Sequence, residues 1–151
     1  MSDRSTEHAT FVLERSYDAA AGRVFDAWAS VDAKSAWFGP PGGGAGYELD
    51  FRVGGRERFM AEAPDGARYT YTAVYYDIVP EQRIVMAYEM YRGEERISVS
   101  VATVEFEAQG ERTLLRFTEQ GAFLDGHDTC AAREHGTRVL LERLAAALGP
   151  R

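Results

Sequence analysis

The chain has 151 residues, 45% of them hydrophobic and 27% charged, and this composition is typical of one globular domain with its own core. The formal net charge is −7 and no cluster of lysines or arginines stands out, so nucleic acid and anionic membrane surfaces are not expected partners, because phosphate binding needs concentrated positive charge. No segment reaches the roughly 18 consecutive apolar residues of a membrane span, so we expect no membrane insertion. The chain starts without the apolar core of a signal peptide and has one cysteine, Cys130, so the cytoplasm is the expected compartment.

The first part of the chain predicts one strand followed by two short helices. We expect residues 1–8 to be a disordered tail and residues 9–148 to form a single domain. Residues 10–16 alternate in polarity and predict a strand. A helix follows over residues 20–29, with Asp18 as its cap. A second short helix over residues 33–38 is capped by Ser30 or Asp32 and stopped by the Gly-Pro-Pro that follows it.

A glycine-rich segment, PPGGGAG at residues 40–46, separates these helices from the rest of the chain. It has neither the phosphate-loop pattern nor a helix directly after it, so it is not a phosphate loop. It is either a plain connector or a mobile lip at the mouth of a cavity.

Most of the sequence between residues 46 and 120 predicts strands, because apolar and polar residues alternate between short turn segments. The connections are too short for crossovers, so neighbouring strands pair antiparallel. The predicted strands cover residues 47–53, 56–63, 68–78, 83–90, 96–107 and 113–119.

The strand over residues 96–107 has apolar residues on both faces. Ile97, Val99 and Val101 share one parity, whereas Val104 and Phe106 share the other. A β-bulge near residues 102–103 would reconcile them. The alternative is that one apolar row faces outward and joins a homodimer partner.

The last helix is predicted over residues 125–148, where an apolar residue recurs every three, four or seven positions. Asp125 or Asp128 is expected to cap it, and Gly149 to end it. Gly136 lies in mid-helix, at a cost of about 1 kcal/mol relative to alanine. This glycine is either a tolerated defect or the point where a strand or a ligand approaches the helix backbone. One long helix and one large sheet predict an α+β fold, in which a curved antiparallel sheet of six or seven strands surrounds the C-terminal helix.

The order of these elements resembles the helix-grip fold of the START and pollen-allergen superfamily, also called SRPBCC. Local motifs resemble one branch of it, the homologues of the C-terminal domain of the heat-shock-protein-90 ATPase activator. These motifs are AW at 27–28, WFGP at 37–40, RVGG at 52–55, PDG at 64–66, YYDIVPEQRIV at 75–85 and TEQG at 118–121. The branch often has Gly-Trp in its last helix, where this chain has Gly136-Thr137, and the loss of an indole would enlarge the cavity or place a hydroxyl in it.

The resemblance implies a cavity between sheet and helix, since members of the superfamily bind lipids, hormones and polyketides and a minority are enzymes. A face rich in tyrosine and methionine suits a mostly apolar ligand, because a tyrosine adds a polar group to an apolar ring. The alternative is a filled core. The candidate ligand-binding residues are Phe25, Trp28, Trp37, Phe59, Tyr69, Tyr71, Tyr75, Met86, Tyr88, Phe117, Thr137 and Leu141.

Two carboxylates, Glu57 and Glu119, share the parity of inward-facing aromatic residues and are the candidates for acid–base catalysis. Arg56, Arg58 and Arg116 are their candidate partners. The alternative is that these arginines are solvated, because they lie on the opposite parities. The competing expectation places both carboxylates near the open edge of the sheet. His127 and His135 are too far apart along the helix for a metal pair, and no nucleotide or nucleophile motif occurs, so we expect no metal and no cofactor.

Three functions remain open. The leading hypothesis is non-enzymatic binding of a small apolar or aromatic molecule between the sheet and the last helix. The first alternative is an enzyme of the cyclase, aromatase or hydrolase type, acting on a bound aromatic substrate through Glu57, Glu119 or a tyrosine. The second alternative is a chaperone-associated interaction module, as the branch name suggests. A homodimer is compatible with all three.

Overall fold

The computed structural model describes residues 4–39 and 46–149, and within these ranges seven strands form one antiparallel sheet. The strand order is β1-β7-β6-β5-β4-β3-β2. The first strand in the sequence is therefore an edge strand and pairs with the last one, β7. The strands are β1 (Thr6–Tyr17), β2 (Glu48–Leu49), β3 (Arg56–Glu62), β4 (Arg68–Val79), β5 (Arg83–Arg92), β6 (Glu95–Gln109) and β7 (Arg112–Leu124).

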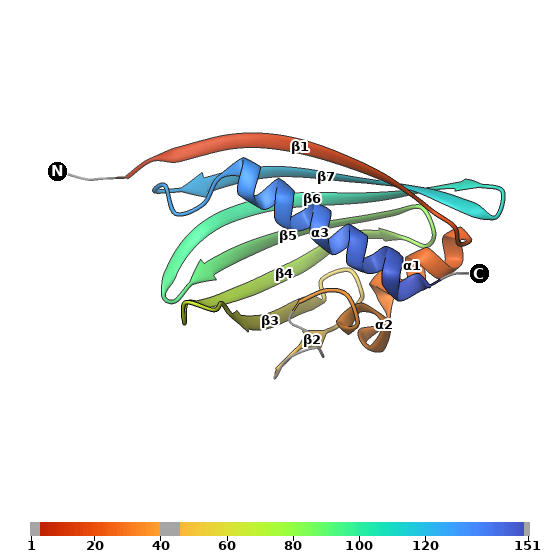
Figure 1. Ribbon diagram of the computed structural model, residues 1–151, viewed down its shortest axis with the longest axis horizontal. Coiled ribbons are helices and arrows are strands. Elements are labelled where there is room, and N and C mark those ends of the chain that lie inside the picture. Colours follow the sequence, from red (N-terminus) through yellow and green to blue (C-terminus); the bar gives the residue numbers. More distant parts are fainter. Residues whose placement is uncertain (1–3, 40–45, 150–151) are drawn as a thin grey trace.

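Three helices complete the described fold: α1 (Ala21–Ala29), α2 (Val31–Ser35) and α3 (Cys130–Leu148). Figure 1 shows α3 lying across one face of the curved sheet, with α1 and α2 at one end of it. The face of α3 that meets the sheet carries Thr137, Leu141, Leu144 and Leu148, all buried and spaced at helical intervals. The predicted α+β helix-grip architecture is therefore confirmed.

The inward face of the sheet follows from the alternation of side chains along each strand. Tyr71 and Tyr75 of β4 stand opposite Met90 and Met86 of β5, so the predicted tyrosine and methionine rows meet on one face. Both tyrosines and Met86 are buried, and Met90 is half-buried. Trp28 of α1 packs on this face at 6.4 Å from the ring of Phe117 in β7.

The structure also resolves the ambiguous strand β6. The inward row begins with Ser98 and Ser100, both buried, whereas Val99 and Val101 are 40% and 42% exposed. The register irregularity lies between Met90 and Tyr91, opposite Ile97, so the predicted bulge near residues 102–103 is wrong. Val99 and Val101 do face outward, whereas Ile97 is buried, and the role of the two valines in a dimer stays a prediction.

Several predicted boundaries are wrong for local reasons. Residues 6–8, expected in a disordered tail, pair with residues 122–124 of β7, because β7 extends beyond its predicted end. Asp18 does not cap α1, whose first residue follows Ala20 without a side-chain cap. The second helix begins and ends earlier than predicted, with Ser30 as its cap, and β2 is only two residues long.

The start of α3 is also displaced from its prediction. Asp125 has a φ of 56° and lies in the turn after β7, so the helix begins only at Cys130. Its cap is Thr129, whose Oγ1 accepts a hydrogen bond from the Ala132 amide at 3.1 Å. Gly149 ends the helix as predicted. The segment 40–45, predicted as a connector or a lip, lies outside the described residues.

None of the helices in the described ranges combines the length and apolarity needed to cross a bilayer.

Candidate functional site

A pocket of about 230 Å³ lies between the inner face of the sheet and α3. Its walls are mostly aromatic and aliphatic side chains from α1, α2, β3 to β7 and α3. Nine of the twelve candidate ligand-binding residues line it: Trp28, Trp37, Phe59, Tyr71, Met86, Tyr88, Phe117, Thr137 and Leu141. Their contact with a ligand stays a prediction.

The other three candidates do not line this pocket. Phe25 packs edge-on against Phe51 and Phe106, with centroids 5.7 Å and 5.4 Å away. Tyr69 is half-buried near the start of β4, and Tyr75 is buried with its hydroxyl on Glu57. Alternation along a strand predicts which face a residue takes, but not how far along the sheet the pocket extends.

Small side chains on α3 leave room at the rim of the pocket. Ala132 and Gly136 line it one helical turn apart, and both are exposed. A Cβ added at Gly136 would meet no atom within 4 Å, so no strand approaches the helix there. Thr137 is buried, and its hydroxyl donates to the Arg133 carbonyl oxygen at 3.0 Å. The threonine hydroxyl is therefore already hydrogen-bonded. Compared with the tryptophan that the branch often has here, Thr137 leaves more space in the pocket.

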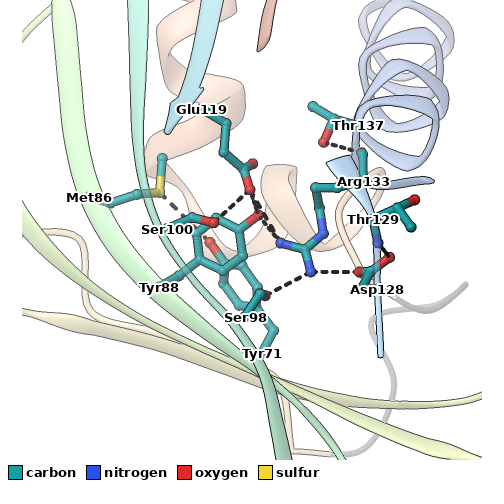
Figure 2. A network of polar contacts seen from close by, with 10 residues as sticks. All are labelled: Tyr71, Met86, Tyr88, Ser98, Ser100, Glu119, Asp128, Thr129, Arg133 and Thr137. Carbon is teal, nitrogen blue, oxygen red and sulfur yellow. Dashed lines mark hydrogen bonds and ion pairs between the residues drawn. The ribbon is translucent and has the colours of Figure 1, made fainter. Parts of the chain in front are cut away.

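One end of the pocket holds a polar network around Arg133 (Figure 2). This guanidinium donates to the Tyr88 hydroxyl at 2.9 Å, the Glu119 carboxylate at 3.2 Å, Ser98 at 2.8 Å and Asp128 at 2.9 Å. The network ties α3 to β5, β6 and β7. Burial alone would lower the pKa of Arg133, but Tyr88, Glu119 and Asp128 together raise it, so the side chain is a permanent cation.

Glu119 is 1% exposed and uses only one of its two oxygens within the described residues. Its Oε2 accepts from Tyr88 at 2.6 Å, Ser100 at 2.8 Å and Arg133 at 3.2 Å. Figure 2 shows the other oxygen, Oε1, turned away from these donors. Burial and the neighbouring carboxylate raise the pKa of Tyr88, which keeps its hydroxyl protonated as a donor.

A second polar cluster surrounds Glu57, which is fully buried. Its Oε1 accepts from Lys34 Nζ and from the Tyr75 hydroxyl, both at 2.8 Å, and its Oε2 accepts from the Tyr47 hydroxyl at 2.5 Å. Both oxygens are therefore bonded. Burial, then Glu57, raise the pKa of Tyr47 and Tyr75. Burial lowers the pKa of Lys34, and Glu57 opposes this shift.

The sequence placed both carboxylates on the inward face, and their burial contradicts the competing expectation of a position near the open edge of the sheet. The three arginines considered as their partners are wrong. Arg56 and Arg58 alternate with Glu57 and point outward, and Arg116 binds Glu14 at 2.8 Å on the outer face. The true partners, Lys34 and Arg133, come from helices far away in the sequence. The sequence did contain one feature that could have drawn attention to Lys34: it is the only lysine of the chain, beside 16 arginines.

Within residues 4–39 and 46–149, no three or more histidine, cysteine or acidic side chains come together in a way that could hold a metal ion. His127 instead lies 2.7 Å from Glu95. The site thus offers an apolar pocket with two hydrogen-bonded polar ends, one around Arg133 and one around Lys34.

A family model described as "Activator of Hsp90 ATPase homolog 1-like protein" matches residues 18–149. No curated protein matches the chain. Among solved structures, an uncharacterized protein from Rhizobium leguminosarum is 48% identical, with a TM-score of 0.91 over 96% of this chain and 97% of that one. A protein from Rhizobium loti is 45% identical, with a TM-score of 0.89 over 95% and 99%. CalU16 from Micromonospora echinospora, 18% identical with a TM-score of 0.67 over 97% and 87%, shares the fold.

Proposed function

Because the chain belongs to the family of activator of Hsp90 ATPase homolog 1-like proteins, whose fold is typical of ligand-binding proteins, we propose that it binds a small, largely apolar aromatic molecule between the sheet and α3. The observation that carries this proposal is the pocket of about 230 Å³ with its wall of aromatic rings. Ligand sites are typically concave and mostly apolar, with a few polar groups that fix orientation.

The arrangement of the rings favours a flat ligand. Tyr71 lies 5.1 Å from Phe59 in a stacked geometry and 4.8 Å from Tyr88 in a tilted one. Trp28 and Trp37 meet edge to face at 4.7 Å. These residues line one pocket, so an inserted aromatic ring finds both faces and edges to pack against.

The rim at Gly136 supports access from outside. A helix interior that could hold alanine holds glycine, although nothing fills the space beside it. Glycine destabilises a helix there by about 1 kcal/mol relative to alanine. In return, the absence of a side chain leaves room beside the pocket.

The test is a rim variant with a matched control on the same helix. Gly136→Leu adds a side chain where a Cβ has free space, so the protein should fold, and it should abolish binding of 2-naphthylmethanol. Ala131→Leu makes a comparable change at an exposed position that does not line the pocket, and should leave binding unchanged.

Binding is measured by isothermal titration calorimetry and by the fluorescence of Trp28 and Trp37, which both line the pocket. Native mass spectrometry of the purified protein shows whether a natural ligand is retained. Equal affinity in the folded Gly136→Leu variant and the wild type would show that the probe binds elsewhere and would refute the proposal.

A further inference from the structure

The only lysine of the chain, Lys34, is completely buried and lines the same pocket as the aromatic rings. The other 16 basic residues are arginines. The side chains of lysine and arginine differ in whether they can lose their proton inside a protein. A guanidinium keeps its proton, whereas a buried ammonium can lose it and become a neutral nucleophile.

The surroundings of Lys34 provide a place for that proton. Nζ lies 2.8 Å from Glu57 Oε1 and 3.2 Å from the Tyr75 hydroxyl. Transfer of one proton across the short contact converts the ion pair into an amine and a carboxylic acid, and apolar surroundings favour such a neutral pair. The rings of Phe38 and Trp28, at 4.3 Å and 5.4 Å from Nζ, favour the charged form, so the two forms compete.

We propose that Lys34 captures an aromatic aldehyde or ketone in this pocket by forming an imine with its carbonyl carbon. This inference rests on the proposed function, because the carbonyl compound must first bind between the sheet and α3. It deepens that function by naming the chemical class of the ligand and the residue that holds it.

The reaction is balanced without an oxidant or a reductant. The amine lone pair of Lys34 forms the N–C bond, and the carbonyl oxygen takes the proton from the Glu57 carboxylic acid. Glu57 then receives a proton from nitrogen and returns it to the carbinolamine hydroxyl, which leaves as water while the C=N bond forms. The products are a protonated imine, the Glu57 carboxylate and one water molecule.

Access to Nζ requires a side chain to move, because Nζ has no exposed surface and lies over the ring of Phe38. Phe38 lines the pocket and is 9% exposed. Phe38→Ala should therefore increase the rate of imine formation.

The test is reductive trapping. Wild-type protein is incubated with 2-naphthaldehyde and sodium cyanoborohydride, which reduces an imine to a stable secondary amine. The mass should rise by that of the aldehyde less one oxygen atom, and peptide mapping should place the added group on Lys34. An excess of 2-naphthylmethanol, which has no carbonyl group, should compete for the pocket and slow the labelling.

The outcomes separate this inference from the proposed function. If the alcohol binds and the aldehyde labels only the α-amino group of the chain, the imine is refuted while the pocket stands. If neither compound binds, the proposed function fails as well. If labelling at Lys34 does not compete with the alcohol, the carbonyl compound reaches the amine outside the pocket, which also refutes the inference.

Two variants address the role of Glu57. Lys34→Met alone leaves a buried carboxylate without its cation, so Lys34→Met is combined with Glu57→Gln, and this double variant should fold and lose all internal labelling. In Glu57→Gln alone, Lys34 Nζ still lies 3.2 Å from the Tyr75 hydroxyl but has lost the carboxylate that raised its pKa. The pH at which trapping becomes half-maximal should fall, and an unchanged profile would exclude Glu57 as the proton acceptor.

Discussion

The two buried glutamates differ in how their carboxylate oxygens are hydrogen-bonded. Glu57 has three donors spread over both oxygens, whereas Glu119 places three donors on Oε2 alone. An unmade hydrogen bond of a buried polar atom costs about 1–3 kcal/mol, so Glu119 Oε1 is a point where a ligand donor or a water molecule gains free energy.

We predict that Glu119→Gln destabilises the fold by about 1–3 kcal/mol, because the substitution removes the charge that pairs with Arg133 inside the protein. The measurement is the free energy of unfolding in urea. The control is Glu14→Gln, which disrupts the Arg116–Glu14 pair on the surface and should cost less than about 1 kcal/mol. Equal losses in the two variants would contradict the buried network.

Helix α3 is the element that joins the pocket to the polar network. Thr137 and Leu141 face the sheet, Ala132 and Gly136 lie at the rim, and Arg133 links the first turn to three strands. One helix therefore contributes part of the wall, the rim and one of the two basic side chains of the site. Substitutions on it should separate stability from binding according to the face that they change.

We predict that Gly136→Ala raises the free energy of unfolding by about 1 kcal/mol, because alanine has the higher helix propensity and its Cβ meets no atom within 4 Å. The same variant should bind 2-naphthylmethanol more weakly, since the added methyl group narrows the rim. Thermal unfolding followed by circular dichroism tests the first effect and calorimetry the second.

Gly121→Ala is the matched control in β7. Its Cβ would lie 2.9 Å from Ser100 Oγ and 3.1 Å from the Phe123 ring, so this variant should lower the melting temperature. Destabilisation by both alanines would mean that the free space at Gly136 does not exist.

The pH dependence of the stability of the whole molecule is set in part by five tyrosines that stay protonated in its interior. Burial is the largest cause that raises the pKa of each one, and Glu57 or Glu119 adds to it for all but Tyr17. These tyrosines are Tyr17, Tyr47, Tyr71, Tyr75 and Tyr88. The unfolded chain loses these protons near pH 10, whereas the folded chain keeps them. The stabilisation is therefore complete below about pH 10 and is lost as the pH rises towards the folded pKa values.

We predict that the free energy of unfolding falls above about pH 10, by about 1.4 kcal/mol per pH unit for each tyrosine that stays protonated in the fold. Urea unfolding at a series of alkaline pH values measures the slope. Tyr17→Phe removes one of these groups and should reduce the slope by about one proton, although it also removes the hydrogen bond to the Leu141 carbonyl oxygen. A stability independent of pH in this range would contradict protonated interior tyrosines.

Local patterns in the sequence determined the order of elements and the inward face of most strands. Alternation placed Tyr71, Tyr75, Met86, Tyr88 and Phe117 on one face, because a strand turns successive side chains to opposite sides. Helical spacing identified Thr137 and Leu141 as the buried face of α3, and the order of motifs identified the family. Boundaries were predicted less well, because caps such as Thr129 depend on the exact backbone turn before the helix.

Only the tertiary structure decided the partners of the buried charges and the extent of the pocket. Glu57 meets Lys34 across 23 positions of sequence, and Glu119 meets Arg133 across 14, and no periodicity within a strand encodes such a pairing. The sequence by itself determined which side chains face inward on most strands and on α3, since that depends on the local geometry of strand and helix. Which inward side chains touch one another, and where space remains between them, was decided by how α2 and α3 pack on the curved sheet.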